Sequence, residues 1–179
     1  MYYRLMSNEE NFRNYIMDGY SKEYADKFDG SSLKVTYQPV TFKMTLKTES
    51  KYPIADFQSG SMPICSEKTK RALEEICDKE EVEFLPCHLE GTNEVYYILN
   101  VLGLEDCVDY EKSKFVTFPS NVNKIMLFEH IQFRKEVDRN IFRIKDLKYC
   151  YYFINEKTKQ HLEASDLSGL LISDELFRW

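Results

Sequence analysis

The strongest constraint on this fold is an amphipathic helix that lies between apolar strands. Ser66 opens the helical segment, and a serine hydroxyl at an N-cap accepts a hydrogen bond from the free amides of the first turn. Four apolar residues at helical spacing then form one face: Ala72, Leu73, Ile76 and Cys77. Apolar segments follow at 82–85 and 95–102, and both predict strands. A short helix with one apolar stripe has to lie against such a layer, so the sequence indicates helix-on-sheet packing.

The same arrangement recurs 89 residues further along the chain. Segments 66–74 and 155–163 are identical at six of nine positions, and Asn155 is again a favoured N-cap residue. Each segment lies between two apolar stretches, which are 62–65 and 82–85 for the first and 151–154 and 170–172 for the second. Gly169 is predicted to be the C′ residue that ends the second helix. Two interpretations are open: capped amphipathic helices converged on common residue types, or the chain contains an internal structural repeat.

The remaining periodicity predicts mainly strands. Tyr2 to Met6 is a strand candidate, and Asn8 to Met17 is a helix candidate. Alternation over 33–46 predicts two half-buried strands, or one strand broken at Gln38-Pro39. Further strands are predicted at 116–118, 125–133, 141–144 and 150–154, of which 125–133 also fits a buried helix. We therefore predict an α+β fold in which a mainly antiparallel sheet carries a few short amphipathic helices, with residues 1–179 forming a single domain.

Length and composition limit the class of protein. A chain of 179 residues supports one sizeable core or at most two small ones. Hydrophobic residues make up 43% of it, which excludes a disordered chain. No apolar run approaches the ~20 residues of a membrane span, and Met1 to Ser7 is too polar for a signal peptide, so no membrane partner is expected. The five cysteines are an odd number without a Cys-x-x-Cys pair, so we expect free thiols and a reducing cytoplasm.

The formal net charge of −6 conceals a strongly acidic central segment. Residues 74–111 contain twelve carboxylates and one base, Lys79, whereas the flanking parts of the chain are weakly basic. Such a segment repels the phosphate backbone of nucleic acid, so we expect no nucleic-acid partner and instead a protein with a basic surface. Six acidic residues are candidates for that contact: Glu80, Glu81, Glu105, Asp106, Asp109 and Glu111. The alternative interpretation is a solvated acidic face that binds nothing.

No pattern in the sequence predicts catalysis, a cofactor or a metal site. Cys87 and His88 are adjacent, but neighbouring residues on a strand point to opposite faces, which separates a thiol from its base. His88, His130 and His161 are far apart, and no Cys or His pair has the spacing of a zinc site. Glycine-rich phosphate-binding motifs and nucleophile motifs are absent from the sequence. We therefore predict no catalytic, cofactor-binding or metal-binding residues.

Several motifs resemble a bacterial family that was first described as a domain of unknown function. The first three are Ala55 to Phe57, Ile64 to Lys68 and Val82 to Pro86. The next runs from Tyr96 to Leu102 and ends with Asp106 to Asp109. The last begins at Ile141 to Ile144 and extends to Leu167 to Leu170. The family they resemble is immunity family eleven of the polymorphic toxin systems. The resemblance is strongest over 52–172, whereas residues 1–51, a predicted strand and turn region, match only in general style. Ala55 stands where the family often has proline.

The resemblance implies an immunity protein, which binds and silences the toxin of its own cell or of kin. We therefore expect a cytoplasmic, non-enzymatic protein that neutralises a cognate bacterial toxin by tight stoichiometric binding. The motifs lie in predicted core segments and transfer no catalytic residue. Two alternatives stay open, namely an enzyme of unrecognised type and a non-catalytic adaptor for protein interactions. A neighbouring toxin gene would separate the immunity protein from both alternatives.

Overall fold

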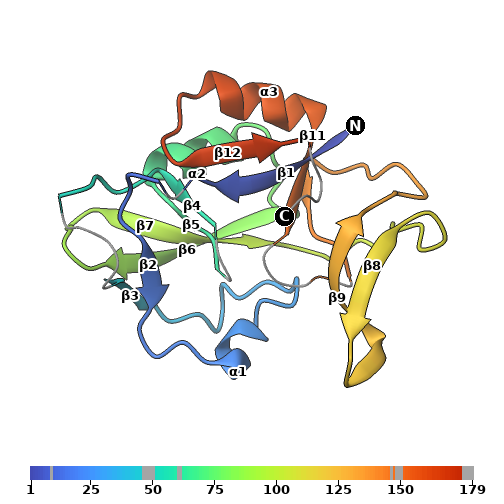
Figure 1. The fold of residues 1–179 in the computed structure, drawn as a ribbon. Coiled ribbons are helices and arrows are strands. Elements are labelled where there is room, and N and C mark those ends of the chain that lie inside the picture. The colour runs from blue at the N-terminus through green and yellow to red at the C-terminus, as the bar shows by residue number, and fades with distance from the viewer. Residues whose placement is uncertain (9, 46–50, 60–61, 146, 148–150, 175–179) are drawn as a thin grey trace.

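The computed structural model describes residues 1–8, 10–45, 51–59, 62–145, 147 and 151–174, and its strands form two sheets and a separate hairpin (Figure 1). The smaller sheet has the strand order β10-β11-β1-β12, and its pairings are antiparallel. Its strands are β1 (Tyr2–Ser7), β10 (Ile141–Phe142), β11 (Tyr152–Asn155) and β12 (Leu170–Ser173). This sheet therefore joins the start of the chain to its last third.

The larger sheet has the strand order β2-β3-β6-β7-β5-β4. Its strands are β2 (Tyr15–Met17), β3 (Thr41–Met44), β4 (Phe57–Gln58), β5 (Ile64–Cys65), β6 (Val82–Leu89) and β7 (Val95–Val101). The hairpin consists of β8 (Lys114–Phe118) and β9 (Asn121–His130), and the helices are α1 (Lys22–Ala25), α2 (Glu67–Glu74) and α3 (Glu156–Ala164). The predicted α+β class with mainly antiparallel strands is confirmed, but the strands form two sheets, and β3 runs parallel to β6.

Two local predictions in the N-terminal region are wrong. Residues 8–17 contain a turn followed by β2 instead of a helix, and the alternating burial of the β2 side chains is that of a strand. Residues 33–37 form a turn instead of a strand, in which the amide of Tyr37 donates to the carbonyl of Leu33 at 2.8 Å. Alternation over so few residues does not distinguish a strand from a turn. The segment 125–133, which also fitted a helix, is strand for most of its length.

The chain contains an internal structural repeat, in which each unit consists of four strands and a helix. The first unit is built from β4, β5, α2, β6 and β7, and the second from β10, β11, α3 and β12, with β1 as its last strand. The strand orders correspond, being β4-β5-β7-β6 and β10-β11-β1-β12. The registers correspond as well, because Cys65 pairs with Tyr97 as Ile154 pairs with Tyr3. Shared helix residues alone would not produce a common register, so the structure supports the repeat interpretation.

Residues that the two helices share make the same contacts in both units. Each unit has a cluster of one tyrosine, one glutamate and one lysine, which are Tyr97, Glu67 and Lys70 in the first and Tyr3, Glu156 and Lys159 in the second. The tyrosine hydroxyl donates to the glutamate in the second cluster, and in both clusters the tyrosine lowers the pKa of the glutamate. The lysine ammonium lies 4.8 Å from the tyrosine ring centre in the first cluster and 5.2 Å in the second. The matching residues therefore reflect matching packing.

The two units bury their inner faces against each other in one core. Corresponding residues supply this core: Cys65 and Ile154, Leu73 and Leu162, Leu99 and Leu5. Two linking segments cover the outer faces of the sheets. The first connector, residues 8–55, adds β2 and β3 to the larger sheet and covers its outer face with side chains such as Phe28. The second connector, residues 102–139, covers the smaller sheet with side chains such as Phe128.

Reciprocal hydrogen bonds join the margins of the two units. Asp56, just before β4, accepts from the amide and the hydroxyl of Ser168, just before β12, at 2.9 and 2.8 Å. Asn140, just before β10, donates its amide and its side-chain nitrogen to Glu81, just before β6, at 2.6 and 3.0 Å. Asp56 also accepts from the hydroxyl of the N-cap residue Ser66 at 2.7 Å. Burial alone would raise the pKa of Asp56, but these hydrogen bonds lower it by more. The pKa of Asp56 therefore lies below its ordinary value.

Gly169 is not the C′ residue of α3, contrary to the sequence prediction. The helix ends at Ala164, and Asp166 takes the left-handed conformation with a φ of 49°. Gly169 has a φ of 74°, and a Cβ added to it would overlap Ala55 and lie 2.7 Å from the carbonyl oxygen of Phe57. Gly169 is therefore needed because only a residue without a side chain lets the second unit approach the first this closely.

Gly169→Ala is expected to destabilise the protein by at least about 3 kcal/mol, because it combines a left-handed backbone with an overlap between the units. Gly19→Ala is the matched control. Gly19 has a φ of 69°, but an added Cβ would meet no heavy atom within 4 Å, so the cost should be about 1–2 kcal/mol. Urea denaturation of both variants measures the difference, and equal destabilisation would contradict the close approach.

The tyrosine–glutamate interactions are expected to make stability depend on pH in the acid range. They hold the pKa of Glu67 and Glu156 below the usual value in the folded protein. Their contribution is therefore complete above the pKa of the unfolded chain and is lost as the pH falls through the folded-state pKa. The double variant Tyr3→Phe and Tyr97→Phe should be less stable at neutral pH and should lose less stability on acidification. Denaturation midpoints across this range check this, and a slope equal to that of the original protein would refute it.

Candidate partner-binding site

The predicted acidic residues come from two loops at the same end of the β6–β7 pair. The amide of Leu102, just after β7, donates to the carbonyl of Glu81, just before β6, at 2.7 Å. The structure thus brings the loop that carries Glu80 and Glu81 close to the loop 105–111. Basic residues of the second connector lie among these carboxylates.

Two of the six candidates are engaged inside the protein. Glu81 is only 5% exposed, and besides its bonds to Asn140 it accepts from the amide of Asp78 at 2.9 Å. Glu105 forms an ion pair with Arg139 at 2.9 Å. The carboxylate of Glu81 therefore holds the second unit in place and is not part of the exposed surface.

Asp106 and Asp109 are paired with basic neighbours. Asp106 lies 2.7 Å from Arg134, and Asp109 lies 3.2 Å from Lys112. Such exposed ion pairs stabilise a fold little, but they reduce the local charge that a partner meets. The acidity of the central segment is thus partly neutralised in space by bases that follow it in the chain.

Glu80 and Glu111 are exposed, and no ion pair among the described residues includes either of them. They are the candidates that the geometry leaves most available to a basic surface. Contact of the six acidic residues with a partner stays a prediction.

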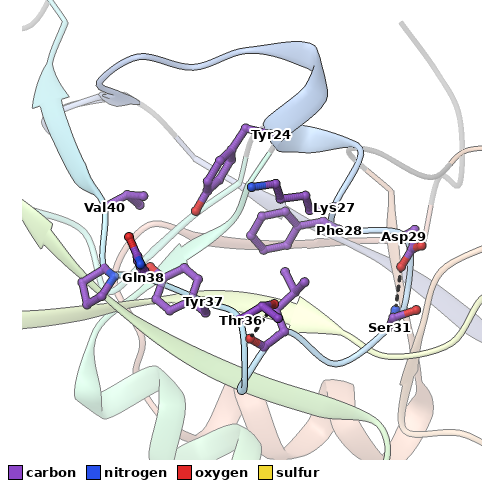
Figure 2. Close-up of a pocket in the computed structure, with 11 residues that line it drawn as sticks. Tyr24, Lys27, Phe28, Asp29, Ser31, Thr36, Tyr37, Gln38 and Val40 are labelled. Atoms are coloured by element: carbon purple, nitrogen blue, oxygen red, sulfur yellow. Dashed lines mark hydrogen bonds between the residues drawn. The ribbon is translucent and has the colours of Figure 1, made fainter.

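A pocket of about 740 Å³ lies between α1 and the segment that follows it (Figure 2). Its lining combines aromatic and apolar residues with nearly as many polar ones, and includes Tyr24, Lys27, Phe28, Leu33, Tyr37 and Gln38. Figure 2 shows Tyr24 from α1 and Lys27 from just after the helix reaching into the pocket, with Tyr37 and Gln38 across from them. Burial raises the pKa of Tyr24 and Tyr37, so both hydroxyls stay neutral at physiological pH. The pocket can therefore receive an apolar or aromatic group.

Two buried charged residues hold the wall of this pocket in place, and the sequence analysis missed both. Glu83 accepts hydrogen bonds from the hydroxyl of Ser32 at 2.7 Å and from the amide of Leu33 at 2.6 Å. Arg143 donates to the carbonyl of Phe28 at 3.0 Å. A charged residue within an otherwise apolar strand segment is the sequence pattern that could have identified them, because a buried charge requires polar partners.

Cysteine and histidine side chains are not arranged for catalysis in the described residues. Burial raises the pKa of Cys77, Cys87 and Cys107 to about 12, so these free thiols stay protonated at neutral pH. Cys87 is buried and His88 is exposed, on opposite faces of β6 as predicted. Cys150 lies outside the described residues. Within the described ranges, no group of three or more His, Cys, Asp and Glu residues could hold a metal ion.

A family model described as the Immunity protein family (Imm11) matches residues 5–174 of the chain. No curated protein matches the sequence. The matched range takes in both connectors and almost all of both units, so the family model corresponds to the complete repeat and not to one unit. In the part of the chain that the structure describes, no helix is long and apolar enough to cross a membrane.

Glu81→Gln is expected to cost about 1–3 kcal/mol of stability, because an amide cannot accept all the hydrogen bonds that reach this buried carboxylate. Glu80→Gln is the adjacent control, and its exposed side chain predicts a change within about 0.5 kcal/mol. Thermal unfolding of both variants checks this. Equal melting temperatures would show that Glu81 has no structural role.

Proposed function

The chain belongs to the Imm11 immunity protein family, and from this premise we propose that it neutralises a cognate bacterial toxin by forming a tight stoichiometric complex. The family match over residues 5–174 carries the proposal. We place this activity in the cytoplasm, where the immunity protein of such a system protects the cell that makes the toxin. In this proposal the whole chain acts as a single binding domain.

The shared core of the repeat supports inhibition by steric occlusion. The two units share one core and exchange hydrogen bonds at Asp56 and Asn140, so the surface is held in shape before a partner arrives. A preordered surface loses little conformational entropy on binding, which favours high affinity. The pocket beside α1 can receive a side chain of the toxin, and exposed Glu80 and Glu111 can face a basic part of it.

Stoichiometry separates this function from its alternatives. The probe is the toxin domain encoded in the adjacent reading frame. Co-expression of the chain should restore growth to cells that produce this domain, and the purified proteins should form a complex of fixed composition. Titration should reduce the toxin activity linearly to zero at the equivalence point, as expected for tight binding.

Two other outcomes would contradict the proposal. Complete inactivation of the toxin by a small fraction of an equivalent, with dependence on time, would indicate an enzyme. A stable complex in which the toxin keeps its full activity would indicate an adaptor.

A further inference from the structure

The hairpin β8–β9 is the part of the second connector that lies outside both sheets. Figure 1 shows it projecting away from the body of the protein. Its strands pair with each other and belong to neither larger sheet. The smaller sheet is covered by buried side chains of the flanking parts of the connector, such as Val108, Ile131 and Val137, and by Phe128 at the base of the hairpin. The exposed end of the hairpin is therefore available for a role other than support of the core.

Burial divides the hairpin into an anchored base and an exposed end. At the base, Phe128 is fully buried, and its ring centre lies 5.7 Å from that of Phe115. Towards the turn, Val122 is 72% exposed and Met126 is 40% exposed, and Val116 is exposed as well. Exposed apolar side chains on a projecting element are available to a partner protein. Because the base of the hairpin is anchored by buried side chains, the exposed end has a defined position on the protein.

The charge of the hairpin differs from that of the chain as a whole. Segment 114–130 carries Lys114 and Lys124 against Glu129, whereas the whole chain has a formal net charge of −6. The ammonium of Lys124 lies 5.4 Å from the ring centre of Phe118, which holds a cation near the turn. The exposed end of the hairpin thus combines apolar side chains and a cation with the polar residues Ser120, Asn121 and Asn123.

The pairing within the hairpin is irregular on the β9 side. The register shifts between Lys114 and Phe115 and again on both sides of Thr117, and the extra residues at each shift lie on β9. Such irregularities twist a strand and interrupt the ladder of backbone groups that another strand would need. A partner would therefore contact the hairpin through its side chains and its turn.

We propose that the hairpin β8–β9 enters a cleft of the cognate toxin, with Val122 and Met126 against an apolar wall and Lys124 facing acidic groups at the rim. This inference rests on the proposed toxin-binding function and deepens it. A narrow projecting element is complementary to a concave surface, and the ligand sites of enzymes are concave and mostly apolar. An inserted hairpin would exclude substrate directly from such a site.

Two hairpin variants test this inference with the toxin domain from the adjacent reading frame. The first, Val122→Glu with Met126→Glu, places two carboxylates on the exposed end. The second replaces residues 118–124 by Asn-Gly, a two-residue turn that joins the paired residues Thr117 and Ile125. Leu171→Glu is the matched control, because Leu171 is 44% exposed but lies on β12 of the repeated core.

Both hairpin variants should bind the toxin at least about 100-fold more weakly by calorimetry, with unchanged melting temperatures, while Leu171→Glu binds like the original protein. Hairpin variants that bind with full affinity would overturn the inference and leave the proposed function intact. Failure of the original protein to bind or protect would overturn the proposed function itself. Gel filtration covers the remaining case: if the hairpin variants lose self-association but keep toxin binding, the hairpin joins two copies of this chain and the inference is wrong.

Discussion

Neither unit of the repeat can bury its own inner face. Each consists of short strands and one helix, and the apolar stripe of such a helix must lie against another layer. When the units pack face to face, both inner faces are buried at once, because Leu73 and Leu162 enter one core. The backbone groups at its margins then need partners, and the contacts of Asp56 and Asn140 supply them from the opposite unit. Each unit therefore depends on the other for its core and for its hydrogen bonds.

Elements that are defined by local residue patterns, such as the two capped helices, could be predicted from the sequence. The N-cap side chains of Ser66 and Asn155 accept from the amides three residues ahead at 3.3 and 2.9 Å, and the identical residues of the two helices left an internal repeat as one of two interpretations. The sequence could not show that β1 completes the second unit, because pairing between distant segments leaves no local pattern. The first connector was predicted poorly for the same reason. Its turn at 33–37 depends on Glu83, which lies far away in the chain.

Charge along the sequence was a poor guide to charge in space. Within the acidic segment, Glu83 is buried and holds the first connector, Glu81 joins the two units, and Glu105 pairs with Arg139. These carboxylates have structural roles that require specific donors, and the donors come from parts of the chain that are distant in sequence. The acidic candidates were therefore identified by composition, but their availability depends on tertiary contacts that composition does not contain.

In the proposed toxin complex, the symmetric core would supply stability and the two connectors would supply recognition. The two connectors join corresponding points, since one leads from β1 to β4 and the other from β7 to β10, yet they have unrelated structures. One forms β2, α1, β3 and the pocket, whereas the other forms the projecting hairpin. A toxin without internal symmetry needs a single recognition surface, which two identical halves would not provide. Functional residues concentrate on connecting segments that a rigid scaffold positions. The departures from symmetry are thus the part of this fold in which specificity for one partner can arise without disturbing the shared core.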